Sequence, residues 1–158
     1  MFQQLEDSIL EILQNNNIDT LAWSGKAEEL FLIPKKLPAV RYILENVDFK
    51  EQLSLNHYTV NAKFSLLVFF RSLKEKAQGA YSLIETIINN LCTTLPFGFS
   101  LSLLSIDLLY HQSSEFCYQI KFNANGKYII SIPEEELVRR ITTYQGDDII
   151  SDVFSIGG

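Results

Sequence analysis

The sequence predicts an α+β fold: a mostly antiparallel sheet with two helices packed on it, plus a C-terminal helical extension. Two observations lead to this class. In two segments apolar residues recur at every third or fourth position, the period of a helix, and in several others they alternate with polar residues, the period of a strand. The 158 residues are the size of one domain. We place this domain at residues 1–132 and the extension, a helix followed by a tail, at 133–158.

The first helix is predicted from about Gln3 to Gln14. Its apolar residues form one stripe, and the asparagine run that starts at Asn15 ends it. Short extended segments are expected at residues 18–23 and 30–33, with turns between them. A strand with one wetter face follows from residue 39 to 49. The helical stripe consists of Phe2, Leu5, Ile9, Ile12 and Leu13.

The clearest alternation predicts a long strand from Tyr58 to Phe70. A second amphipathic helix follows it, with an apolar face that runs from Ala80 to Leu91. Ser72 and Glu75 have the spacing of a capping box, but Gly79 leaves the start of this helix open. A Leu- and Ile-rich strand from Phe99 to Tyr110 then forms a hairpin with a return strand. In that return strand Phe116, Tyr118, Ile120 and Phe122 point inward and Cys117 points outward.

Another turn is predicted at residues 123–126, because Asn125-Gly126 is the strongest short hairpin signal in the chain. One more alternating strand would follow from Tyr128 to Ile132. Pro133 and the three glutamates after it suit the first turn of a helix, because proline and carboxylates both favour that position. This helix is expected to end near Arg140 or Thr142.

Charge and composition exclude several classes of protein. The formal net charge is −6, whereas a protein that grips phosphate backbones needs lysine and arginine clustered on one face, so we expect no specific nucleic-acid binding. The amino terminus has no basic region and no apolar core, which argues against a signal peptide, and no run approaches the length of a membrane span. The two cysteines fit a reducing compartment. These features favour the cytoplasm, unless the chain leaves it with an assembled particle.

No catalytic, cofactor-binding or metal site is predicted. Glycine-rich, P-loop, GxSxG and HExxH motifs do not occur. His57 and His111 suit solvated positions better than a metal site. Cys92 is expected at the carboxyl end of a helix, where the dipole raises a thiol pKa, and with Cys117 on an outward face neither suits a nucleophile.

Two further features have structural interpretations. On strict alternation Asp107 shares a strand face with leucines, where its charge would need a partner such as Lys63; a bulge that turns it to solvent is an equal alternative. Trp23 is interpreted as a core residue rather than part of a ligand box. A modest basic neighbourhood, interpreted as a solvated face, is formed by Lys26, Lys35, Lys36 and Arg41.

One stretch carries a family resemblance. From Phe69 to Ile87 the long strand ends in Arg71-Ser72, and Gly79-Ala80-Tyr81 opens the second helix. With Leu91 and the strand pair after it, this stretch resembles the Mu-like family of small phage tail proteins, relatives of the tail terminator or tail-completion proteins of phages and phage-derived contractile particles. The resemblance runs over roughly Gln3 to Phe122, about three-quarters of the chain.

The resemblance implies a structural protein rather than an enzyme, with a tail-terminator-like fold. Its subunits would join into a homohexameric ring that caps the tail tube, ends tube polymerisation and joins the tube to the head or sheath end. The implied partners are the chain itself, the tail tube protein and the sheath or head–tail connector protein, without cofactors, membrane or specific nucleic acid. The ring would belong to the tail of a virion, a prophage-encoded particle or a contractile injection system, assembled in the bacterial cytoplasm.

Contacts with other subunits or the tube are expected at the corner between the long strand and the second helix and in the C-terminal tail. Two other hypotheses remain open from the sequence. One is an intracellular α+β adaptor that binds one partner protein, and the other is an enzyme, a hydrolase, built from Asp107 and His111. The residues expected at contacts are Arg71, Lys74, Glu75, Lys76, Ile149, Ile150, Val153 and Phe154.

Overall fold

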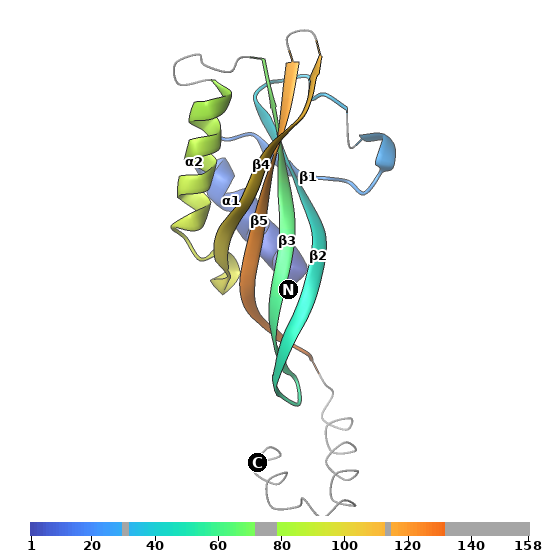
Figure 1. Cartoon of the computed structure of the whole chain (residues 1–158), viewed down its shortest axis with the longest axis vertical. Helices are drawn as coiled ribbons and strands as arrows, with labels where there is room; N and C mark the ends of the chain where they lie inside the picture. The colour runs from blue at the N-terminus through green and yellow to red at the C-terminus, as the bar shows by residue number, and fades with distance from the viewer. Residues whose placement is uncertain (30–31, 72–78, 113–114, 132–158) are drawn as a thin grey trace, which may run out of the picture.

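The computed structural model describes residues 1–29, 32–71, 79–112 and 115–131, which form a five-stranded sheet with two helices on one face (Figure 1). The predicted α+β class is confirmed. The predicted C-terminal helix and tail lie outside the described residues, as do Ser72 and Glu75. The helices are α1 (Phe2–Asn15) and α2 (Ala80–Cys92), and the strands are β1 (Thr20–Ala22), β2 (Ala39–Ser54), β3 (His57–Phe70), β4 (Ser100–Gln112) and β5 (Glu115–Ile129).

The strands lie in the order β1-β2-β3-β5-β4 (Figure 1). The β2–β3, β3–β5 and β4–β5 pairs are antiparallel, and short β1 runs parallel to the first residues of β2. Long β3 is central because its alternating face carries the largest apolar side chains, and it pairs along its whole length with β5. The order leaves β4 at one edge of the sheet, while β1 covers only three residues of β2 at the other edge.

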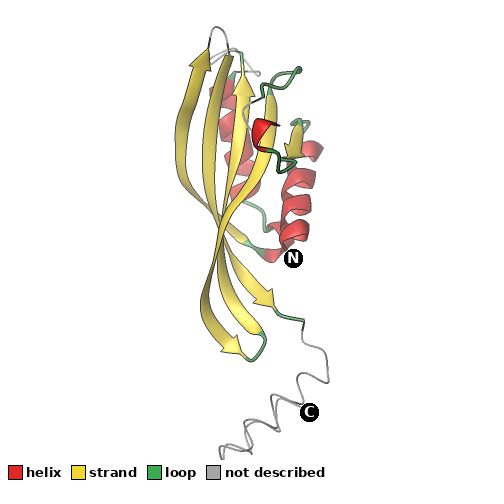
Figure 2. Ribbon diagram, turned by 90° about the vertical axis from the view of Figure 1, so that its right-hand side faces the viewer, coloured by secondary structure: helices red, strands yellow, loops and turns green. Residues whose placement is uncertain are grey.

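The main core lies between the sheet and the two helices (Figure 2). Helix α1 contributes Leu5, Ile9 and Leu13, the stripe expected from the three-and-four spacing, and all three are fully buried. The ring of Phe64 on β3 stacks on that of Phe122 on β5, with centroids 5.1 Å apart. Alternation therefore fixed which face of β3 and β5 the helices cover.

The opposite face of the sheet is also buried near the carboxyl end of β3. Leu67 and Phe69 of β3 pack there with Cys117 of β5, against the partly buried Leu37 and Ile43. Cys117 does lie on the face opposite to the helices, as alternation predicts, but it is fully buried rather than solvated. Burial raises the pKa of its thiol to about 12.

We expect one thiol per native chain to react rapidly with a maleimide at pH 8. Partial burial raises the pKa of the Cys92 thiol as well, but Cys92 is exposed and within reach of the reagent, whereas the Cys117 thiol is fully buried. Mass spectrometry after timed labelling should give one adduct in buffer and two in denaturant. A Cys92→Ser variant serves as the control and should give no rapid adduct; two rapid adducts on the native wild type would contradict the buried position of Cys117.

Strand β5 departs from the prediction at residues 123–126. The prediction of a turn at Asn125-Gly126 is wrong. These residues lie within β5, opposite Asn61 and Val60 of β3. Two physical reasons account for this. Strand β3 extends far enough to supply pairing partners for residues 123–126, and the ring of Phe99 lies directly against Gly126, so a residue without a side chain is required inside the strand. The strand expected separately from Tyr128 is thus the end of β5.

The ends of β2, β3 and β5 form an arm that projects beyond the helices (Figure 2). Its base is an aromatic cluster on the helix side of the sheet. The ring of Phe49 meets those of Tyr58 and Tyr128 edge-on, and Tyr128 stacks on Phe2 at a centroid distance of 5.5 Å. Edge-to-face and stacked pairs stabilise such a cluster beyond the area that they bury. The arm therefore packs against the amino terminus of α1 through the contact between Tyr128 and Phe2.

Candidate functional site

The most unusual surface of the described protein is the edge strand β4. Leucine and isoleucine side chains along it remain between 39% and 52% exposed, although one side of the strand is paired with β5. Natural edge strands are commonly protected by lysine, proline or charge, but the only charged residue of β4 is Asp107. The exposed apolar row consists of Leu103, Leu104, Ile106, Leu108 and Leu109.

Two irregularities shape this row. Register shifts in the β4–β5 pairing fall between Leu103 and Ser105 and between Leu108 and Tyr110, which adds Leu104 and Leu109 as extra residues. Directly opposed residues share a face, so the partners of Leu103, Ile106 and Leu108 on β5 place these three on the helix side. We call the five side chains the β4 apolar row.

Asp107 illustrates the effect of the first bulge. It lies opposite Gln119 on the face away from the helices, is exposed, and accepts a hydrogen bond from the Ser105 hydroxyl at 3.0 Å. Of the two alternatives open from sequence, the bulge is confirmed and the ion pair with Lys63 is not formed.

The opposite edge of the sheet is open too. Strand β1 pairs with β2 only from Val40 to Tyr42. Beyond this point, no described strand pairs with the outer edge of β2, which continues to Ser54. Phe49 and Leu53 on this part of β2 are about half exposed. As far as the structure describes the chain, the sheet therefore has two different open edges, both with exposed apolar side chains.

Of the predicted contact residues, the described part contains Arg71. It follows the last residue of β3 and forms a long ion pair with Glu115 at the start of β5, with 3.9 Å between Nη2 and Oε1. Its side chain is mostly exposed, so the pair contributes little to stability. Lys74, Glu75 and Lys76 lie outside the described residues, and so do Ile149, Ile150, Val153 and Phe154. The structure brings none of them together with Arg71 in its described part.

A second feature is a half-open cavity of about 440 Å³ beside β1 and the start of β2. Trp23 lines it and is half-buried, so this residue is neither a core residue nor fully solvated. Two members of the predicted basic neighbourhood, Lys35 and Arg41, line the same cavity, whereas Lys26 contacts Trp23 beside it. The remaining lining residues are Leu21, Ala22, Ser24, Glu29, Leu32, Ile33 and Pro34.

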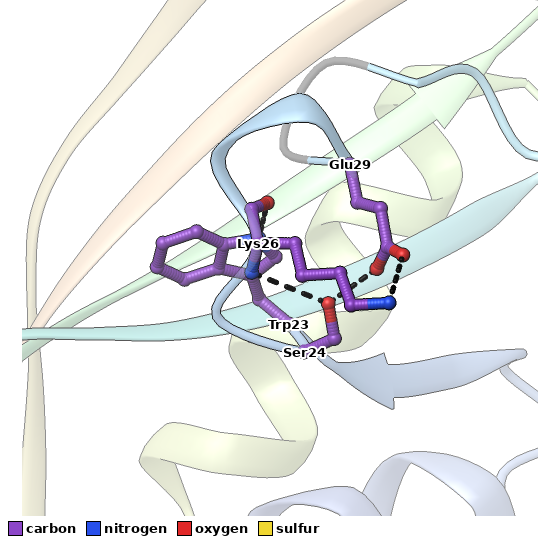
Figure 3. A network of polar contacts seen from close by, with 4 residues as sticks. All are labelled: Trp23, Ser24, Lys26 and Glu29. Carbon is purple, nitrogen blue, oxygen red and sulfur yellow. Dashed lines mark hydrogen bonds and ion pairs between the residues drawn. The ribbon is translucent and has the colours of Figure 1, made fainter.

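A local polar network holds the loop beside this cavity (Figure 3). The indole N–H of Trp23 donates to the carbonyl of Lys26 at 2.8 Å, and the Lys26 ammonium lies 3.5 Å from the Glu29 carboxylate. The Ser24 hydroxyl donates to the same carboxylate. That hydrogen bond lowers the pKa of Glu29, and the charge of Lys26 acts in the same direction. These contacts hold the indole of Trp23 in place and pair the carboxylate of Glu29 with Ser24 and Lys26.

Side chains suited to metal binding do not cluster in the described part of the chain, where no three His, Cys, Asp or Glu residues come together. His57 lies at the arm, and its Nδ1 is 2.8 Å from both the Ser54 hydroxyl and the Asn56 side-chain oxygen. None of the helices within the described ranges has the length and apolarity needed to span a membrane.

Sequence reasoning missed both surfaces. The sequence predicts a leucine-rich strand at residues 100–109. Because this strand has apolar side chains on both faces, the pattern does not distinguish a buried strand from an exposed edge. A usable signal was present: this strand has one charged residue and neither lysine nor proline, unlike a protected edge. For the cavity, the sequence indicates the basic cluster with Lys35 and Arg41 but gives no signal for the apolar wall beside them.

Comparisons with known proteins add little. No family model matches the chain, and no curated protein does. A solved structure from Akkermansia muciniphila, described as being without its transmembrane region, aligns with 83% of this chain and 83% of its own, at 8% identity and a TM-score of 0.32. A likeness of this size supports no conclusion about fold or function.

Proposed function

We propose that this chain is a ring-forming tail terminator of a phage or phage-like particle. One observation carries the proposal: among the described residues the sheet has two different open edges on opposite sides, β4 with its apolar row and the outer part of β2. A contact between unlike surfaces repeats from subunit to subunit, and it produces a ring when the rotation closes. The resemblance of Phe69–Ile87 and the following elements to tail terminators supplies the rest of the proposal, a six-membered ring on the tail tube.

The edge of β4 is suited to contact with another strand. Its outer backbone N–H and C=O groups have no described partner strand, and the β4 apolar row lies beside them. Backbone pairing would satisfy the polar groups, while covering the leucines would remove apolar surface from water at about 25 cal/mol per Å². An edge of this kind on a monomer risks uncontrolled association, so a defined ring is a natural use for it.

The proposal is tested by native mass spectrometry over a range of concentrations, with negative-stain images of the same samples. We expect a species six times the mass of the 18.1 kDa chain and ring-shaped particles, and binding of the protein at the ends of purified tail tubes. A chain that remains monomeric at every concentration and also fails to bind tube ends would contradict the proposal. A stable monomer that binds one protein unrelated to tails would favour the adaptor instead.

Charged substitutions in the β4 apolar row are expected to prevent assembly. The double variant Ile106→Asp, Leu108→Asp places two carboxylates where we propose an apolar contact, and its association constant should fall by about 100-fold or more. The fold should survive, because both side chains are about half exposed in the monomer.

The control is Leu95→Asp, which introduces one carboxylate at a leucine that is more exposed but lies outside β4; it is compared with the double variant and with Leu108→Asp alone, which introduces the same charge within the row. Leu95→Asp should assemble like the wild type. Equal assembly of the double variant and the wild type, with unchanged circular dichroism, would remove β4 from the interface.

A further inference from the structure

The cavity beside β1 has the chemistry of a site for an acidic, apolar peptide. Its volume of about 440 Å³ lies within the range of roughly 300–1,000 Å³ that is usual for ligand sites. The indole of Trp23 and the apolar side chains of Leu21, Ile33 and Pro34 supply most of the wall. Lys35 and Arg41 supply positive charge at the same place.

These two cations are available. In the described part of the chain neither Lys35 nor Arg41 forms an ion pair, and the Arg41 guanidinium donates one hydrogen bond, to the carbonyl of Val40 at 2.9 Å. The carboxylate of Glu29, which also lines the cavity, is already engaged by Ser24 and by Lys26. The cavity therefore has a net excess of unpaired positive charge beside apolar surface.

The chain itself contains a segment of complementary character. Residues 145–158 carry three aspartates, at positions 147, 148 and 152, and no lysine or arginine. The same segment has five large apolar residues, at positions 149, 150, 153, 154 and 156. We propose that this segment of one copy binds in the Trp23 cavity of a second copy, with aspartates toward Lys35 and Arg41 and an apolar side chain, Phe154, against the indole.

The place where the described chain ends favours a second copy as the donor. Ile129 pairs with His57 at the arm, whereas the cavity is lined by Arg41, next to Val40, which pairs with Val68. His57 and Val68 are 11 residues apart on β3, which is about 36 Å along a strand. Strand β5 also runs away from the cavity. To reach its own cavity the chain would have to reverse and return along nearly the whole sheet. This inference rests on the proposed function in one respect: two copies of the chain must associate.

The chain has one tryptophan and seven tyrosines, so emission excited at wavelengths that only tryptophan absorbs reports on this cavity. The test uses two full-length variants. The acceptor, Phe154→Asp, keeps Trp23 but has a charged residue where we place the apolar anchor; the donor, Trp23→Phe, keeps the segment but has no indole. We expect the acceptor to emit at longer wavelength than the wild type, and titration with the donor to restore the wild-type emission.

Two further variants serve as controls. A donor that carries Trp23→Phe together with Phe154→Asp should restore nothing. An acceptor that carries Arg41→Glu together with Phe154→Asp should need about tenfold more donor for half of the shift. Circular dichroism verifies that each variant is folded. Raising the salt concentration to about 1 M, where the Debye length is about 3 Å, should weaken the restoration.

Two results would overturn the inference. Identical emission from the wild type and the acceptor at all concentrations would mean that the segment does not enter the cavity. Suppose instead that the wild type emits at shorter wavelength than the acceptor at every dilution, and that no donor restores this emission to the acceptor. Each chain would then fill its own cavity. Native mass spectra of the same samples keep the two proposals apart, since a ring with unchanged Trp23 emission contradicts this inference alone, and a Trp23 shift without a ring contradicts only the ring.

Discussion

Replacing Phe64 by alanine is expected to lower the free energy of unfolding by about 3–5 kcal/mol, the range for deletion of a buried aromatic ring. Phe64 is fully buried at the centre of the sheet, where its ring stacks on Phe122 and lies 5.2 Å from that of Tyr42. The loss combines the lost transfer free energy of the ring with the cavity left beside the rings of Phe122 and Tyr42. Urea denaturation followed by far-UV circular dichroism measures it.

A graded series makes this prediction specific. Phe64→Leu keeps most of the volume and should cost less than the alanine variant. Leu95→Ala removes a side chain that is 67% exposed and should change the stability by no more than about 0.5 kcal/mol. If Phe64→Ala were no more harmful than Leu95→Ala, the stacked position of Phe64 between sheet and helices would be incorrect.

Replacing Gly126 by valine should cost about 2–3 kcal/mol, at the upper end of the range for overpacking. A Cβ atom at Gly126 would lie 2.5 Å from two ring carbons of Phe99. Phe99 is itself buried immediately before β4, and therefore has little room to move away. Thermal and urea unfolding of the variant measure the loss.

A double-mutant cycle identifies the cause of this loss. Removing the ring with Phe99→Ala destabilises the protein by itself, but it also frees the space that the introduced valine needs, so the double variant should be less destabilised than the sum of the two single variants. Asn125→Ala is the neighbouring control on the other face of β5 and should cost less. Strict additivity would show that Phe99 and Gly126 are not in contact.

Periodicity was sufficient to predict α1, β3 and α2. The stripe of α1, the alternation of β3 and the apolar face of α2 each have one strong period, and each element begins and ends within a few residues of the prediction. Such patterns record which side of an element faces the core, and this property is local. The α+β class follows from the order of these elements.

Local signals failed where a distant residue decided the outcome. Asn125-Gly126 is a strong turn signal, yet β3 supplies the pairing partners and Phe99, 27 positions earlier in the chain, covers the glycine. Similarly, Cys117 points away from the helices as alternation requires, but Leu67 and Phe69 bury it on the second face. Both outcomes depend on contacts that no short window of sequence contains.

The sequence by itself determined the composition of the two candidate surfaces, namely the leucine-rich segment 100–109 and the cations near Trp23. Only the tertiary structure decided that the first is an open edge and that the second borders a cavity. The physical reason is that strand order depends on which strands find partners across the whole chain. Because β5 pairs with β3 and places β4 outside it, apolar side chains that could have been core are left facing solvent, where we propose that another subunit covers them.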